Sequence, residues 1–113
     1  MVTATNLSPA LDEVVSRLVR GLKAEQIYLF GSQASGLAGP GSDYDLLVVV
    51  PHSDLPRHQR EAFSYDLLWG LTTPVDVIVF TRAEFQHSAQ VKTSLAATAK
   101  DKGILLYGKS QDR

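Results

Sequence analysis

The sequence predicts an α/β fold in which a small mixed sheet of three to four strands is covered by helices. Three short apolar runs, at residues 27–30, 46–50 and 75–80, have the length and composition of strands. Segments with helical periodicity lie between these runs, which is typical of alternating strands and helices. The run at 46–50 is apolar without alternation, so it predicts a central strand that is buried on both faces.

The first helix is predicted to begin at Ser8-Pro9, because Ser is favoured as an N-cap and Pro as the first helical residue. Its core-facing side is formed by apolar residues at helical spacing: Leu11, Val14, Val15, Leu18 and Leu22. A strand at 26–30 follows. Residues 33–41 are small and glycine-rich, so they predict at most one or two helical turns before a loop that leads into the strand at 44–50.

The second half of the chain continues the alternation. A helix over about 55–71 is predicted, capped by Ser53 or Asp54, with a strand at 75–81 and short helices at 83–90 and 91–102 after it. The first of these helices is expected to face the core through Phe63, Leu67, Leu68 and Leu71. Gly103 is predicted as the residue that follows the last helix, before a final apolar segment at 104–107.

Length and composition indicate a single globular domain. The 113 residues predict one domain over 1–113, with 1–7 as a loose N-terminal tail, and the 44% hydrophobic and 20% charged content is ordinary for a soluble protein. The chain has no cysteine, which excludes disulfides and thiolate metal sites and is compatible with the cytoplasm. Its apolar runs are too short to cross a membrane, so we expect a soluble cytoplasmic protein without a membrane partner.

The charge of the chain argues against binding to long nucleic acids. The net charge is −1, so no global positive field attracts them. Basic residues recur at helical spacing at Arg17, Arg20 and Lys23, and again at Arg57 and Arg60. Solvated helix faces are the plainer interpretation of these groups, and a docking surface for an acidic partner or RNA is the alternative.

Three carboxylates at strand starts predict a metal site. Asp43 and Asp45 directly precede the central apolar run and point the same way, while Asp76 is the only charge in the next strand. If these strands are neighbours, the carboxylates converge, and like charges raise at least one pKa unless a cation neutralises them. Each Asp taken alone could be structural, but the joint pattern favours a site for magnesium or manganese. Two such ions can assist a phosphoryl displacement.

The Gly31-Ser32 turn suits phosphate. Gly31 has no Cβ, so its backbone can approach a ligand closely, and Ser32 offers an N–H and a hydroxyl. If a helix begins at Ser32 or Gln33, its N-terminal amides would also face the anion. The segment matches neither a P-loop nor a Rossmann fingerprint, because both the lysine and the required glycine order are missing.

These motifs together resemble a known family. The segments Gly31-Ser32-Gln33-Ala34-Ser35-Gly36 and Asp43-Tyr44-Asp45-Leu46, with the later Asp76 strand, resemble the polymerase-β-like nucleotidyltransferase superfamily. The resemblance runs from about Leu11 to Gly108. The short length makes the chain similar to the minimal nucleotidyltransferases, which are antitoxins paired with HEPN-domain ribonuclease toxins.

The resemblance implies a role for each of these residues. It implies that Gly31 and Ser32 hold the triphosphate of an NTP, that Asp43 and Asp45 bind two Mg²⁺ ions, and that Asp76 completes the site and deprotonates the acceptor hydroxyl. Many members carry an Arg where this chain has Ser35, so a group that would help to neutralise phosphate is absent from this position.

The function expected from these observations is magnesium-dependent transfer of AMP from ATP to a hydroxyl, such as a tyrosine of a HEPN-type toxin, by an antitoxin. The alternative is a catalytically weak or inactive module of the same fold that neutralises its partner by occlusion. A metal-dependent hydrolase is a third possibility, although the Gly-Ser turn suits an NTP leaving group better. The sequence leaves open the nucleotide, the acceptor, the number of groups transferred and the oligomeric state.

Overall fold

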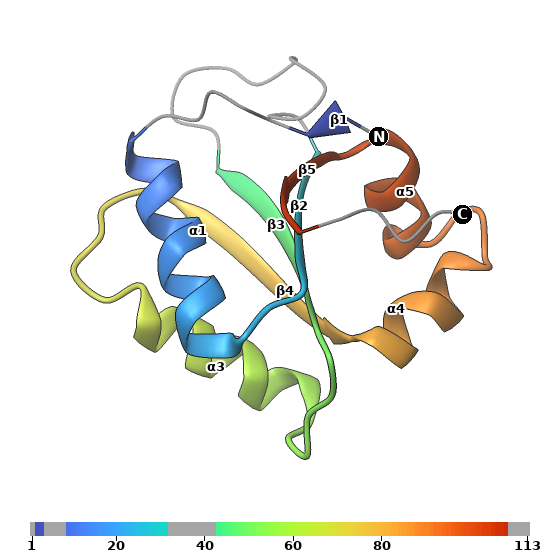
Figure 1. The fold of residues 1–113 in the computed structure, drawn as a ribbon, viewed down its shortest axis with the longest axis horizontal. Helices are drawn as coiled ribbons and strands as arrows, with labels where there is room; N and C mark the ends of the chain where they lie inside the picture. Colours follow the sequence, from blue (N-terminus) through green and yellow to red (C-terminus); the bar gives the residue numbers. More distant parts are fainter. Residues whose placement is uncertain (1, 4–8, 32–42, 109–113) are drawn as a thin grey trace.

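The computed structural model describes residues 2–3, 9–31 and 43–108 (Figure 1). Its elements follow in the order β1 (Val2–Thr3), α1 (Pro9–Leu22), β2 (Gln26–Phe30), β3 (Tyr44–Val50), α3 (Arg57–Leu67), β4 (Val75–Thr81), α4 (Arg82–Ala89), α5 (Leu95–Lys102) and β5 (Ile104–Tyr107). The alternation of strands and helices predicted from the sequence is therefore confirmed. None of the helices in the described ranges is long and apolar enough to span a membrane.

The strands form one mixed sheet in the order β1-β5-β2-β3-β4. β2 runs antiparallel to both β3 and β5, whereas β3 and β4 are parallel. The predicted mixed sheet is thus confirmed, with four main strands. The two-residue β1, which was not among the predicted strands, adds to one edge by pairing in parallel with β5.

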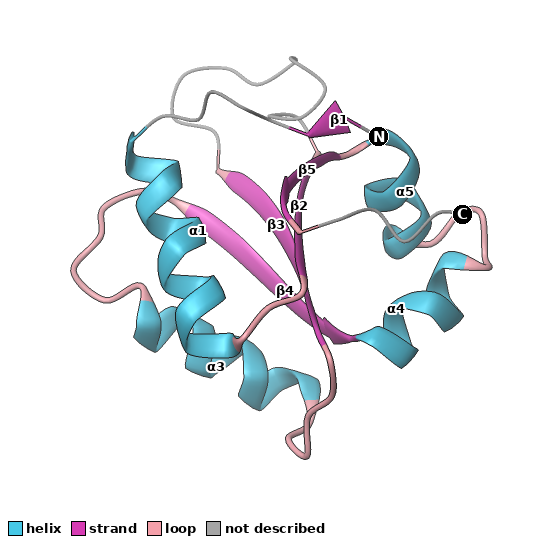
Figure 2. Cartoon of the chain, viewed as in Figure 1, coloured by secondary structure: helices cyan, strands magenta, loops and turns pink. Residues whose placement is uncertain are grey.

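Helices cover both faces of the sheet (Figure 2). α1 and α3 lie on one face, where Leu46 and Val48 of β3 join the larger apolar cluster. α4 and α5 lie on the other face, where Leu47 and Val49 of the same strand join a second cluster with Phe85. β3 is therefore buried on both faces, as its unbroken apolar run predicts.

β4 forms the other edge of the sheet, and side chains of α3 hydrogen-bond to its backbone. The Tyr65 hydroxyl accepts a hydrogen bond from the Val77 amide at 3.0 Å, and Glu61 accepts one from the Val79 amide at 3.1 Å. Arg60 donates to the Val79 carbonyl at 2.8 Å. Because an open strand edge is a template for unwanted pairing, these contacts protect the edge as well as fixing α3 beside it.

The prediction for α3 was wrong in its length. The helix runs from Arg57 to Leu67 rather than over 55–71, and its N-cap is Pro56, with no side-chain capping bond from Ser53 or Asp54. Pro fits this boundary because its fixed φ and missing N–H suit the edge of a helix. The chain leaves the helix at Leu68, which is buried in the turn that follows.

The prediction for the core-facing side of this helix was wrong at Phe63, although Leu68 is buried and Leu71 packs against the larger apolar cluster. Phe63 is 44% exposed, whereas the buried residues of the helix are Arg60 and Ser64. Arg60 can be buried because Glu84 accepts hydrogen bonds from its guanidinium at 2.8 and 3.0 Å, and carbonyl oxygens accept others. With these partners, Arg60 takes the inward-facing position on α3, and Phe63 is left at the surface. The interpretation of Arg60 as part of a solvated helix face was therefore wrong.

The last two helices begin at clear N-caps. Thr81 and Glu84 form a capping box at the start of α4, and the Ser94 hydroxyl accepts a hydrogen bond from the Ala97 amide at the start of α5. α5 is thus shorter than the predicted 91–102. Gly103 follows α5 directly, as predicted; its φ is −79°, and a Cβ there would approach the Leu29 carbonyl oxygen to 2.7 Å. Close backbone contact, not a positive φ, requires glycine at this position.

Candidate functional site

The three carboxylates lie at one end of the sheet, because three adjacent strands begin or end there. Asp45 of β3 pairs in register with Asp76 of β4 on one side and with Phe30 of β2 on the other. Neighbouring strands are separated by about 4.8 Å, so these positions form a row across the sheet. Asp43 directly precedes β3. We call Asp43, Asp45 and Asp76 the carboxylate edge.

The pleat of the strands decides which face carries these side chains. Asp45 shares a face of β3 with Leu47, and Asp76 shares a face of β4 with Ile78, both on the side of the sheet that α4 and α5 cover. Tyr44 faces the opposite side and packs against the other cluster. Tyr44 and the side chain of Asp45 therefore lie on opposite faces of the sheet.

The electrostatics of Asp45 show that the carboxylates act on one another. Partial burial raises the pKa of the Asp45 carboxyl above its ordinary value, and the charges of Asp76 and Asp43 raise this pKa further. Asp43 and Asp76 are themselves exposed. The charged form of Asp45 is therefore disfavoured in the fold unless a cation lies nearby.

The donor chemistry of the carboxylate edge suits a hard divalent ion. All three side chains offer carboxylate oxygens, which magnesium and manganese prefer, and the half-buried Asp45 carries a charge that such an ion would neutralise. Within residues 9–31 and 43–108, no three His, Asp or Glu side chains already form a set close enough to hold an ion together. The fit to a divalent cation thus rests on the kind of donor atom and on the disfavoured charge of Asp45, and not on a preassembled set of ligands.

Gly31 connects the turn after β2 with the carboxylate edge. Its φ is +75°, and a Cβ at this position would overlap the Asp45 carboxylate, with the Asp45 Cγ only 3.3 Å away. Both the conformation and the space thus require glycine. The close contact places the backbone of the turn directly beside Asp45. The remaining predicted parts of this turn, Ser32, Ser35 and the possible helix start at Gln33, lie outside the described residues.

A groove that the sequence did not predict lies on the side of the sheet that α1 and α3 cover. It is formed by the end of α3 and the segment that leads into β4, and its volume is about 490 Å³. Its lining residues are Tyr65, Leu68, Trp69, Gly70, Leu71, Thr72, Thr73, Pro74 and Val75. We call it the β4 groove. Sequence periodicity could not decide between core and surface for the two aromatic residues, and in the structure Trp69 is 86% and Tyr65 45% exposed.

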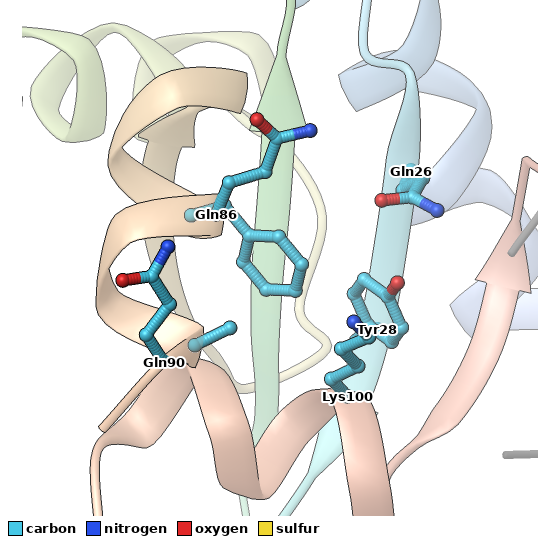
Figure 3. Close-up of a pocket in the computed structure, with 7 residues that line it drawn as sticks. Gln26, Tyr28, Gln86, Gln90 and Lys100 are labelled. Carbon is cyan, nitrogen blue, oxygen red and sulfur yellow. The ribbon is translucent and has the colours of Figure 1, made fainter. Parts of the chain in front are cut away.

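A second cavity lies between β2 and the helices α4 and α5 (Figure 3). Its volume is about 200 Å³, and it is lined by Gln26, Tyr28, Phe85, Gln86, Ala89, Gln90 and Lys100. Figure 3 shows Gln86 on α4 and Gln90 directly after this helix, across from Tyr28 on β2. Gln26 and Tyr28 belong to the first half of β2, whereas Gly31 follows its end, so this cavity is separate from the carboxylate edge.

Several solved structures with a similar fold come from toxin–antitoxin systems. A mutant of the toxin–antitoxin MntA-HpeT is 24% identical with a TM-score of 0.62, over 95% of this chain and 77% of that one. A toxin–antitoxin with AMP-PNP is 24% identical with a TM-score of 0.59, over 89% and 75%. The complex of tri-AMPylated Shewanella oneidensis HEPN toxin with MNT antitoxin is 25% identical with a TM-score of 0.54, over 91% and 73%.

A family model and the geometry lead to the same assignment. No curated protein sequence matches the chain significantly. The model of the nucleotidyltransferase domain, however, matches residues 11–106, a range that includes Gly31 and the whole carboxylate edge. Because this match spans most of the sequence, the chain belongs to the nucleotidyltransferase domain family.

Proposed function

We propose that this chain is a magnesium-dependent nucleotidyltransferase that transfers AMP from ATP to a tyrosine hydroxyl of a HEPN-type toxin and thereby acts as an antitoxin. The observation that carries the proposal is the row formed by Gly31, Asp45 and Asp76 across three adjacent strands. This row combines a backbone that can approach phosphate with carboxylates that can hold metal ions and accept a proton.

The residues of the row and their neighbours Ser32 and Asp43 have the following roles in the proposal. Gly31 and Ser32 bind the triphosphate, and Asp43, Asp45 and Asp76 are the residues that would hold two Mg²⁺ ions, or Mn²⁺ in their place. When bound, these ions neutralise charge on the phosphates and on the attacking and leaving oxygens. Asp76 accepts the proton of the acceptor hydroxyl while the oxygen of that hydroxyl bonds to the α-phosphorus. The bond from that phosphorus to the bridging oxygen of the β-phosphate breaks, and pyrophosphate leaves.

The choice of nucleotide and partner is supported by the similar structures. One of them contains AMP-PNP, an ATP analogue, and another contains a HEPN toxin that carries three AMP groups beside an MNT antitoxin. These properties belong to those proteins. Together with membership of the family, they favour ATP as the donor and a protein hydroxyl as the acceptor for this chain.

A second candidate function is neutralisation of the partner by occlusion alone. Ser35 stands where many members of the family carry an Arg that would help to neutralise phosphate, which favours weak or absent catalysis. The two functions predict different behaviour of variants. Replacing both Asp43 and Asp45 by Ala abolishes neutralisation that depends on chemistry, whereas neutralisation by occlusion survives the double substitution.

The proposal is tested by incubating the chain with labelled ATP, Mg²⁺ and a purified HEPN-type protein from the same organism. We expect label on a tyrosine of that protein, and we expect Asp45→Asn to reduce the rate roughly 100-fold or more, since it removes a metal-binding charge. Chelation of the metal should have the same effect. Absence of label with the wild-type chain, or equal labelling by Asp45→Asn, would refute transfer.

A further inference from the structure

We propose that Ile78 selects the acceptor, because its side chain forms the surface on which the phenol ring of an acceptor tyrosine rests while the hydroxyl reaches Asp76. This inference rests on the proposed transfer reaction and deepens it. The roles of Gly31 and the carboxylates explain how the nucleotide is held, but they do not explain which acceptor is preferred.

The order of the strands sets the direction from which the acceptor enters. Gly31 follows β2, Asp45 lies on β3 and Asp76 lies on β4, so the phosphate turn, a metal-binding carboxylate and the base stand in sequence across the sheet. In a phosphoryl displacement, the attacking and leaving oxygens lie roughly in line on opposite sides of the phosphorus. A pyrophosphate held at the β2 side therefore requires an acceptor that approaches from the β4 side, over the face that carries both carboxylates.

That face of the sheet opens to solvent along the first half of β4. In one row across the sheet, Tyr28 and Leu47 are 2% and 0% exposed, whereas Ile78 beside Leu47 is partly exposed. α4 begins at Arg82, after the far end of β4, and leads away from the start of that strand (Figure 1). The cover of the sheet is therefore incomplete at Ile78, and an incoming side chain can contact it.

The open part of β4 is bounded at both ends. Asp76, Ile78 and Phe80 alternate with residues of the other face, so they follow one another on the same face of the strand. Phe80 is 9% exposed, and the Arg57 guanidinium lies 5.5 Å from the centre of its ring, which closes the far end. The exposed Asp76 forms the near end. A ligand here thus contacts Ile78 with an apolar part and Asp76 with a polar tip.

The spacing between Asp76 and Ile78 fits a phenol. Two successive residues on one face of a strand are about 6.5 Å apart. In tyrosine, the hydroxyl is attached to the end of the ring opposite to Cβ, so a hydroxyl at Asp76 leaves the ring over Ile78. In serine and threonine, the hydroxyl is attached to Cβ itself, so the same position of the hydroxyl leaves Ile78 uncovered. Burial of apolar surface therefore favours tyrosine.

The test compares Ile78→Ala with Val75→Ala. Val75 is also a partly exposed apolar residue of β4, but it packs on the opposite face of the sheet. With the purified HEPN-type protein as acceptor, we expect Ile78→Ala to lower kcat/KM for the acceptor roughly tenfold or more. The affinity for Mg²⁺-ATP, measured by calorimetry, should stay unchanged. Val75→Ala should behave as wild type, and Ile78→Leu, which preserves volume, should retain most of the transfer.

A change in the acceptor tests the same contact from the other side. When the target tyrosine of the acceptor is replaced by serine, wild type should lose roughly tenfold or more in kcat/KM. Ile78→Ala should lose less by this replacement, because the ring no longer has a surface to cover. The two changes therefore form a double-mutant cycle across the interface.

Thermal unfolding of each variant is measured as well, since Ile78 packs partly against the core. If Ile78→Ala does not fold, Ile78→Val should show a smaller loss of kcat/KM in the same direction. Equal kcat/KM values for wild type and the folded Ile78 variants would overturn the inference while leaving the transfer reaction intact. Equal labelling of the tyrosine and serine acceptors by wild type would overturn it too. If the wild-type chain labels neither, the proposed function fails, and the inference falls with it.

Discussion

Gly31 is the residue at which local backbone geometry and the carboxylate edge meet. Its positive φ disfavours any other residue, and its missing Cβ leaves room for the Asp45 carboxylate. Two separate penalties therefore oppose a substitution here. The first is backbone strain, and the second is displacement of a side chain that is proposed to bind metal.

These two penalties can be measured separately, because Gly70 provides a matched control. Gly70 also has a positive φ, of +88°, but a Cβ there would meet nothing within 4 Å. We expect Gly70→Ala to lower the free energy of unfolding by about 1 kcal/mol from strain alone. Gly31→Ala should cost about 1–2 kcal/mol more, because Asp45 must move. Both values are obtained from urea denaturation.

A double-mutant cycle identifies the source of the extra cost. Asp45→Ala removes the group that the new Cβ would overlap, so Gly31→Ala should cost no more than Gly70→Ala in that background. If Gly31→Ala lowers the free energy of unfolding equally with and without the Asp45 carboxylate, contact with that carboxylate does not constrain the turn.

At the scale of elements, the ion pair between Arg60 and Glu84 joins α3 to α4. The guanidinium lowers the pKa of Glu84 to about 2 from its ordinary value of 4.5. A depressed pKa means that the charged carboxylate stabilises the fold above pH 4.5, and that this stabilisation is lost as the pH falls towards 2. Arg60 is buried, but Glu84 is 45% exposed, so solvent screening reduces the contribution to about 1–2 kcal/mol.

The variant Glu84→Gln tests this pair without removing the cap of α4, since Gln can replace Glu in a capping box. We expect its free energy of unfolding to lie below that of wild type at pH 7, and the difference to shrink between pH 4.5 and 2. Glu13→Gln, which alters an exposed pair with Arg17, serves as the control and should change stability by less than about 0.5 kcal/mol. If the difference in free energy of unfolding between wild type and Glu84→Gln stays constant over this pH range, the low pKa of Glu84 is contradicted.

The comparison of α3 with β3 and β4 shows which elements a sequence can predict. The bounds of both strands were predicted closely, because apolar runs end at charged residues or proline and the carboxylates mark the strand starts. For α3, the predicted helix was too long, and Phe63 was wrongly predicted to face the core. Periodicity places Phe63 inside and cannot reveal that Arg60 pairs with Glu84 on another helix. Because the β4 groove forms where α3 ends early, it could not be predicted either.

At the scale of the whole molecule, the carboxylate edge lies on strands that also carry the core. β3 contributes Leu46 and Leu47 to the two apolar clusters on opposite faces of the sheet, and the same strand carries Asp45 as its second residue. Binding at the edge is thus linked to the stability of the whole cooperative domain. Repulsion among the three carboxylates lowers the stability of the fold until a ligand neutralises them.

This linkage predicts opposite effects of Asp45→Asn on stability and on ligand response. Without metal, Asp45→Asn should raise the free energy of unfolding by about 0.5–1 kcal/mol, because it removes a charge that burial and its neighbours disfavour. With Mg²⁺-ATP at about 100 times its Kd, wild type should gain about 2.7 kcal/mol, whereas the variant should gain far less. Thermal unfolding with and without EDTA measures both effects. An equal rise of Tm on adding ATP to wild type in EDTA would show that the nucleotide binds without the metal, and the carboxylate edge would then have no part in holding it.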